Sequence, residues 1–409
     1  MDTTITVNTS ITVGDIRHYG NHAAGTITIN GSDSFTFSNS SENASIESAH
    51  SGVYDPTFWL GPYLINVPIN IDVDTFTIGA SVQSIGQMTA VGGRDVTVNA
   101  NLRIVAQTYT NNDLGGGILN VSAVGAFLIL DGPNSAGGSN TTIRILAGRC
   151  DFMNTTTKIG NIEVVANCQT VPNNVVVGSI NINSNKTWDV FTTTDQSTVR
   201  VASGETFFID TDGLLYMHHF NNIRSGDIRI STNSFLTGFG TIVTLPSGTH
   251  APHVYLESGA TLNPGSTNVL TGIFHVGSAT YPDTAVTLEP GAVMAFDLAG
   301  TVAGTDYDQV SVDGGTLVIS NSVLNVASIS TTYLLSDYLF LVAENGGSIA
   351  GTFTGVADGD TVEFSSEGKE YKATINYTGD EGTDSLTGGN DIVLSQIYSI
   401  PAGTLILIQ

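Results

Sequence analysis

The chain has 409 residues, with 12 Lys or Arg against 37 Asp or Glu, so its formal net charge is −25. Such an acidic surface repels phosphate backbones and anionic lipid headgroups, which excludes nucleic acid as an expected partner and argues against membrane insertion. Hydrophobic residues make up 41% of the chain, enough for a sizeable core, and the abundance of Thr, Val, Ile, Asn and Gly favours short strands joined by turns over helices.

Short segments in which apolar and polar residues alternate recur along the chain. They lie at 26–29, 74–78, 95–98, 118–121, 142–145, 161–164, 179–182, 198–201 and 227–230. The step from Ile143 to Ile162 is 19 residues and the step from Ile162 to Ile180 is 18 residues. Alternation predicts strands with one apolar face. A near-constant step predicts the coils of a solenoid, each of which buries its apolar face by stacking on its neighbours.

We therefore predict an all-β fold, a parallel β-solenoid. Antiparallel hairpins would produce the same alternation, so β-sandwich modules in part of the chain are the alternative. The predicted organisation is an N-terminal cap with an aromatic-rich insertion in 1–70, the β-helix in 71–300, and a β-rich C-terminal region and cap in 301–409.

The cysteine content is low. Cys150 and Cys168 are the two cysteines of the chain, which excludes a disulfide-dense scaffold and a four-cysteine zinc site. Alignment of 143–145 on 162–164 places these two cysteines within one residue of equivalent positions on adjacent coils. Their Cβ atoms could then approach the roughly 4 Å that a disulfide requires, so a disulfide between coils and a buried pair of free thiols both remain open.

Two segments break the alternating pattern. Residues 51–68 concentrate aromatic residues and prolines, among them Phe58, Trp59 and Tyr63. They predict a packed lid, a subunit contact or a ligand platform, in which Trp59 and Tyr63 would stack on a sugar face. Residues 400–409 predict an apolar strand whose edge pairs within the chain or with another subunit, since open edges invite association.

The N-terminus carries no recognisable signal peptide. The first residues have no basic region and no apolar stretch, so we expect that a leader was removed or that the chain leaves its cell by another route. No apolar run approaches the roughly 20 residues of a membrane-spanning helix.

Motifs between 254 and 395 occur in a characteristic order. They are VYLESGATLNPG at 254–265, LEPGAVMAFDLAG at 288–300, GTDYDQV at 304–310, GTFTGVADG at 351–359, YKATINY at 371–377 and GNDIVL at 389–394. In that order they resemble the distal region of autotransporter-like β-strand-repeat proteins, the large bacterial surface adhesins with β-helical passengers. The resemblance covers about a third of the chain.

The resemblance implies a right-handed parallel β-helix that ends in a β-rich cap and is displayed outside a cell. The family has no general catalytic residues, so none is carried over. The chain departs from the family at its ends, because no leader is present and no membrane barrel follows Leu394. Export through such a barrel is therefore not expected. Tail fibres of bacterial viruses use the same solenoid architecture without a leader.

Asp306 and Asp308 are the carboxylate pair considered for catalysis. Residues at i and i+2 of a strand are separated by roughly 6.6 Å, a spacing near that of the carboxyl pair of a glycosidase. The pair lies in a motif of the resemblance, where it is read as a turn. The few basic residues show no cluster that would hold an acidic polysaccharide.

Metal binding has weak sequence support. The histidines are His18, His22, His50, His218, His219, His250, His253 and His275. Their spacing would matter on a helix but loses that meaning in strands, which favours surface or loop positions. Gly388-Gly389-Asn390-Asp391 echoes one copy of a calcium-binding nonapeptide, and a calcium roll needs several stacked copies. No cofactor is expected, apart from Ca²⁺ that acidic groups would collect at the surface.

These observations predict a non-enzymatic structural or adhesive β-helical stalk that is extracellular and displayed on a cell surface or a virion. One alternative is a phage tail fibre or spike, and another is a polysaccharide depolymerase on the same scaffold. The expected partners are further copies of the chain, as a homo-oligomer, trimer or filament, or the surface glycans of a host.

Overall fold

The computed structural model describes part of the chain. The described residues are 3–7, 11–13, 15–18, 27–31, 35–37, 43–48, 63–65, 69–71, 75–78, 82–85, 88–90, 95–98, 102–105, 117–122, 127–131, 141–153, 159–172, 175–192, 198–219, 227–245, 252–266, 271–329, 333, 336–366 and 368–400. Almost all of their regular structure is β, with one 3-10 helix, η1 (Glu381–Thr383). Contacts divide the chain into two compact units. Unit 1 is Met1–Ala202 with His218–Gly226, and unit 2 is Ser203–Met217 with Asp227–Gln409.

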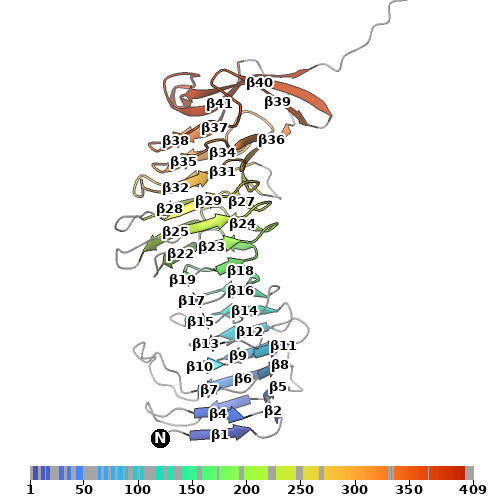
Figure 1. Ribbon diagram of the computed structural model, residues 1–409, viewed down its shortest axis with the longest axis vertical. Coiled ribbons are helices and arrows are strands. Elements are labelled where there is room, and N and C mark those ends of the chain that lie inside the picture. The colour runs from blue at the N-terminus through green and yellow to red at the C-terminus, as the bar shows by residue number, and fades with distance from the viewer. Residues whose placement is uncertain are drawn as a thin grey trace, which may run out of the picture. The chain divides into compact units, whose positions relative to one another are not determined.

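Unit 1 is a series of coils whose strands pair in parallel with those of the next coil (Figure 1). Its first sheet contains β1 (Thr3–Val7), β4 (Ile27–Gly31), β7 (Tyr63–Ile65), β10 (Val82–Ile85), β13 (Leu102–Val105), β15 (Phe127–Asp131), β17 (Arg149–Met153), β19 (Cys168–Pro172) and β22 (Thr187–Thr192). A second contains β2 (Ile11–Val13), β5 (Phe35–Phe37), β8 (Ile69–Ile71) and β11 (Met88–Ala90). A third contains β3 (Asp15–His18), β6 (Asn43–Ser48), β9 (Thr75–Ile78), β12 (Asp95–Val98), β14 (Ile118–Val121), β16 (Thr142–Ile145), β18 (Asn161–Val164) and β21 (Ile180–Ile182). β20 (Val175–Val177) pairs with β23 (Thr198–Val201).

The predicted coil spacing is confirmed by the register of these strands. Ile143 pairs with Ile162, and Ile162 pairs with Ile180, in parallel. Burial alternates within each of these strands, so that the Ile side chains point inward while Arg144 and Glu163 face outward and form an ion pair of 2.7 Å. Strands in a β-solenoid gain stability by burying this apolar face against the next coil.

Unit 2 repeats the arrangement with strands in three parallel series. The first contains β25 (Leu214–His219, most of which lies in this unit), β28 (Thr241–Thr244), β31 (Ile273–Val276), β34 (Gln309–Val312) and β37 (Tyr338–Glu344). The second contains β24 (Thr206–Ile209), β27 (Phe235–Gly238), β30 (Thr261–Pro264), β33 (Val293–Leu298) and β36 (Val323–Ile329). The third contains β26 (Asp227–Ile230), β29 (His253–Leu256), β32 (Ala285–Leu288), β35 (Thr316–Val318) and β38 (Ser348–Ala350).

One turn of unit 2 stacks through a ladder of left-handed residues. Asn233, Gly259, Gly291 and Asn321 have φ values of 60°, 79°, 85° and 58°. The amide of each donates to the carbonyl of the next, and the amide of Asn321 donates to Thr352, at 2.9–3.0 Å. Gly and Asn are the residues that adopt this conformation at least cost, so the sequence places them where every coil makes the same turn.

The C-terminal strands form an antiparallel cap on unit 2. β41 (Asp391–Ile400) pairs antiparallel with β37 and with β40 (Lys369–Gly379), and β40 pairs antiparallel with β39 (Thr361–Ser366). Because β41 occupies the edge of β37 that a further parallel coil would use, the cap ends the parallel series of this sheet.

The fold is therefore an all-β parallel solenoid with a β-rich cap, as predicted. The β-sandwich alternative is wrong for the strands between 95 and 230, whose pairings within each unit are parallel. The alternating segments are not one equivalent set, because 27–31, 161–164 and 198–201 belong to different sheets. The domain boundaries at 70 and 300 stay predictions. Parallel pairing already begins with β1 and β4.

Candidate functional site

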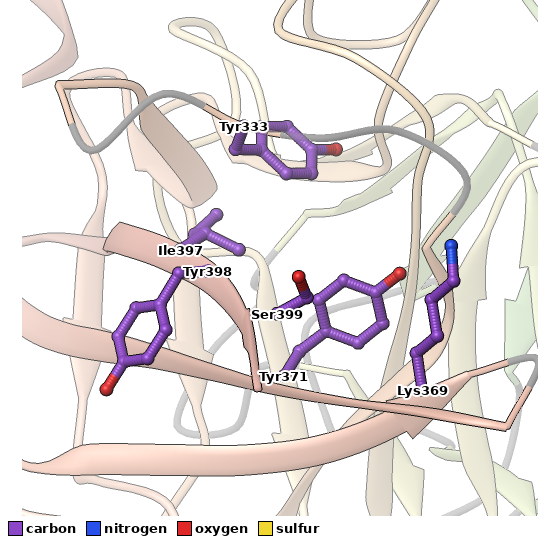
Figure 2. Close-up of a pocket in the computed structure, with 6 residues that line it drawn as sticks. All are labelled: Tyr333, Lys369, Tyr371, Ile397, Tyr398 and Ser399. Atoms are coloured by element: carbon purple, nitrogen blue, oxygen red, sulfur yellow. The ribbon is translucent and has the colours of Figure 1, made fainter. Parts of the chain in front are cut away.

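A pocket in the cap is the candidate site. It is lined by Tyr333, Lys369, Tyr371, Ile397, Tyr398 and Ser399, and its volume is about 90 Å³. Figure 2 shows the hydroxyls of Tyr333, Tyr371 and Ser399 and the ammonium of Lys369 around one space, while the ring of Tyr398 points away from it. Ligand clefts for drug-sized molecules measure roughly 300–1,000 Å³, so this pocket suits one small group.

Strand alternation explains which residues reach the pocket. Tyr371 of β40 pairs directly with Ser399 of β41 and with Phe364 of β39, so these three side chains share one face of the sheet. The rings of Phe364 and Tyr371 stack at 5.8 Å with an interplanar angle of 7°. Lys369 precedes Tyr371 by two residues, and period-two alternation places it on the same face.

The opposite face carries the other lysine of this hairpin. Lys372 pairs with Tyr398 across the two strands, and its ammonium forms an ion pair of 2.5 Å with Glu363. By contrast, no described residue forms an ion pair with Lys369. The pocket therefore contains an exposed positive charge that the neighbouring strands leave uncompensated.

A shift in register brings Ile397 into the pocket wall. The pairing of β40 with β41 shifts between Lys372 and Thr374, where Gln396 adopts a φ of 51°. A bulge of this kind turns a side chain to a face that regular alternation would deny it. Ile397 is buried, at 1% exposure, and supplies an apolar wall beside the hydroxyls.

Tyr333 contributes a buried hydroxyl to the pocket. The residue is 6% exposed, and no described atom meets hydrogen-bond geometry with its hydroxyl oxygen. Burial raises the pKa of Tyr333, and the carboxylates of Asp306 and Asp337 add to the rise. The backbone of Gly300 lies close enough to the hydroxyl to oppose the rise, although the contact does not meet full hydrogen-bond geometry. The Tyr333 end of the pocket thus lies in a negative field, and its hydroxyl remains protonated.

Both carboxylates of the predicted pair, Asp306 and Asp308, accept hydrogen bonds from backbone amides. Asp308 is fully buried, and its two oxygens accept hydrogen bonds from the amides of Gly272 and Asp297, both at 2.8 Å. Burial raises the pKa of Asp308 to about 8, although these amide donors oppose the rise. Asp306 lies in a turn and accepts a hydrogen bond from the amide of Val302 at 3.2 Å. A substrate at the surface could not contact both carboxylates, because Asp308 has no exposed atom.

Asp391, in the calcium-like motif, is also buried. Its oxygens accept hydrogen bonds from the amides of Glu344 and Glu381, both at 2.6 Å. Burial raises the pKa of Asp391, and the two amides oppose the rise. Both carboxylate oxygens are therefore engaged in joining β37, η1 and β41. Among the described residues, no group of three or more His, Cys, Asp or Glu is placed to hold a metal ion.

His275 belongs to a polar cluster on neighbouring coils. Its Nδ1 lies 2.6 Å from Asp313, whose other oxygen accepts a hydrogen bond of 2.6 Å from Ser311. Partial burial raises the pKa of Asp313, but the hydrogen bonds from His275 and Ser311 outweigh it and hold the pKa below its ordinary value. The serine donates to the carboxylate instead of the imidazole, so the cluster lacks the nucleophile–base contact of a hydrolytic triad.

The other histidines fall in strands or outside the description. His18 is in β3, His218 and His219 are in β25, and the ring of His253 stacks on Tyr255 in β29 at 5.5 Å. His22, His50 and His250 lie outside the described residues.

The cysteines are free and buried. Cys150 pairs with Thr170 between β17 and β19, so Cys168 lies two residues before the position opposite Cys150. The predicted offset of one residue is therefore wrong, and the thiols are not joined. Burial raises the pKa of Cys150, and it raises the pKa of Cys168 to about 12.

Most of the predicted aromatic platform in 51–68 lies outside the described residues. Phe58 and Trp59 lie outside the described residues, as do residues 401–409 of the apolar tail. Tyr63 begins β7, and its backbone pairs with Ile27 and Val82, while nothing is described of its side chain. The ligand platform and the pairing of the apolar tail stay predictions.

Sequence reasoning did not find the pocket. Lys369 and Tyr371 carried a usable signal, since two residues of a strand at this spacing share a face. Tyr333 and Ser399 lie beside them because of the topology of the cap and the bulge in β41, and no local sequence pattern predicts either feature.

The described part of the chain contains no helix with the length and apolar character of a membrane span.

Comparison with models of known protein families, with curated proteins and with solved structures found no match.

Proposed function

We propose that the chain is a non-enzymatic, extracellular structural or adhesive protein, displayed on a cell surface or a virion. The observation that carries this proposal is the long run of parallel coils in each unit, closed in unit 2 by an antiparallel cap. Such a scaffold is rigid because each coil is hydrogen-bonded to its neighbours. Its role would be to hold a recognition surface away from the body that carries it.

The placement of acidic side chains supports a structural role over a catalytic one. Both carboxylate oxygens of Asp308 and of Asp391 accept hydrogen bonds from backbone amides of neighbouring segments. Asp313 is engaged by His275 and Ser311. Glycosidases and lyases on this scaffold need carboxylates that face the substrate, and these three are committed to the fold.

The partners follow from the same proposal. An acidic surface of charge −25 resists non-specific association, so contacts are expected at defined places: glycans of a host, or further copies of the chain. The resemblance to autotransporter-like surface adhesins, which rests on the motifs between 254 and 395, points the same way.

The test uses the purified chain in two assays. Beads coated with the chain are expected to adhere to surfaces coated with host cell-surface glycans, while the soluble chain releases no reducing ends and no unsaturated products from the same glycans. Product release that is lost in Asp306→Asn would overturn the non-enzymatic proposal. Absence of adhesion to every glycan and to host cells would remove the adhesive role.

A further inference from the structure

We propose that the cap pocket binds one edge of a carboxylated sugar, with the carboxylate at Lys369 and the nearest ring hydroxyl toward Tyr333, while the rest of the sugar stays outside the pocket. This inference names a ligand for the proposed adhesive role and rests on it.

The charge of the pocket selects an anionic group. Lys369 is exposed and is the ammonium in this hairpin that no described carboxylate neutralises, whereas Lys372 is paired with Glu363. In a chain of charge −25, a lysine that no described carboxylate pairs, beside a concave surface, is a local exception. A ligand carboxylate would gain a charge-assisted hydrogen bond there.

The remaining lining selects a ligand with hydroxyl groups. The hydroxyls of Tyr333, Tyr371 and Ser399 surround the same space (Figure 2), and that of Tyr333 has no hydrogen-bond partner among the described atoms. A buried hydroxyl without a partner costs stability that a ligand hydroxyl would recover. Ile397 and the ring of Tyr371 provide apolar surface for the C–H face of a sugar.

The electrostatic asymmetry sets the orientation. Asp306 and Asp337 act on the Tyr333 end of the pocket, where they raise the pKa of its hydroxyl, while Lys369 lies at the other end. A carboxylate is therefore repelled from Tyr333 and attracted to Lys369. A ligand with a charged end and a neutral, hydroxylated end satisfies both.

The experiment compares two probes that differ at one carbon. Methyl β-glucuronide carries a carboxylate where methyl β-glucoside carries a hydroxymethyl group. Binding to the full chain is measured by ligand-observed NMR and by calorimetric titration. We expect the glucuronide to bind more tightly than the glucoside, and added salt to weaken the glucuronide alone.

The variants separate the pocket from the rest of the cap. Lys369→Gln is expected to weaken glucuronide binding by about five- to tenfold and to leave glucoside binding unchanged. Tyr333→Phe should weaken both probes without lowering the thermal midpoint, because it removes a hydroxyl that has no partner. Lys372→Gln is the matched control, since it removes the same charge from the opposite face, and it should bind as the wild type does.

Three results would overturn the inference: equal affinity for the two probes, equal losses in Lys369→Gln and Lys372→Gln, or displacement of the glucuronide by acetate at equal concentration. In each case, adhesion of the coated beads to the glycans would decide the separate question of function. If adhesion persists in Lys369→Gln, the adhesive proposal stands and recognition lies on another surface.

Discussion

Two buried carboxyl groups of unit 2 join segments of backbone through hydrogen bonds. Asp308 and Asp391 each receive two backbone amides from segments far apart in the chain. Each carboxylate accepts hydrogen bonds from two of these amides, and an unsatisfied buried donor costs about 1–3 kcal/mol. Because these carboxyl groups are buried, their ionised forms are disfavoured, and the pKa of each is raised.

The raised pKa of Asp308 makes stability depend on pH. The folded state holds this proton to about pH 8, whereas the unfolded chain releases it near pH 3.9. The contribution is thus fully present below about pH 4 and is lost as the pH rises through about 8. We expect the thermal midpoint of the wild type to fall over this range more steeply than that of Asp308→Asn, which cannot ionise.

Calorimetric scans of both proteins from pH 4.5 to 8.5 check this expectation. Repulsion among the other acidic groups changes equally in the two proteins, so the difference between them isolates Asp308. Parallel curves would contradict the raised pKa.

The two thiols offer a second test at this scale. Because Cys150 and Cys168 are buried and burial raises the pKa of each, neither forms the reactive thiolate readily. We expect no reaction with a thiol reagent in the native protein, and reaction of both cysteines in denaturant without a reducing agent. Two unreactive cysteines in denaturant would mean that they are bridged.

The strands were predictable where one coil repeats the last. Ile143, Ile162 and Ile180 are spaced by almost constant steps, and the structure pairs them directly. The assignment of strands to sheets was not predictable, since Val175–Val177 and Ile180–Ile182 show the same alternation on different sheets. The predicted offset of the cysteines was wrong for a related reason. It was counted from the pairing of β16 with β18 and applied to β17 and β19, which follow after a turn and lie in another sheet.

The inward residues of these strands should carry most of the stability. Ile162 is 1% exposed, and its replacement by Ala is expected to cost about 2–5 kcal/mol. Its neighbour Glu163 faces outward in a partly exposed ion pair with Arg144, so Glu163→Ala should cost less than about 1 kcal/mol.

Hydrogen exchange locates the effect as well as its size. Since each coil contacts mainly its neighbours, Ile162→Ala should raise exchange in β16, β18 and β21 and leave the cap unchanged. Equal protection in the two variants would show that the inward face contributes little.

For the molecule as a whole, the cap separates a finite protein from an open-ended sheet. β37 pairs with β34 on one side and with β41 on the other, in opposite senses. Without β41, an apolar strand would present its unpaired edge to solvent. The pocket of the cap could not have been predicted from the sequence because Tyr333, Tyr371 and Ser399 meet only once this closure has formed.

Deletion of residues 351–409 is expected to cause association. The truncated chain should elute as larger species whose mass, measured by light scattering, rises with concentration, because the freed edge of β37 pairs between molecules. Circular dichroism should retain the β signal of the coils. A truncated chain that remains at the mass of the full protein would show that the edge is protected by other means.

The parallel series of unit 2 has an evolutionary corollary. β31 offers β34 the same kind of edge that β34 offers β37, so a duplicated coil would find a ready docking partner and pass an equivalent one onward. Recombination between similar segments of the gene can add or remove coils while the C-terminal cap stays intact. The number of coils would then evolve independently of the ligand that the cap recognises.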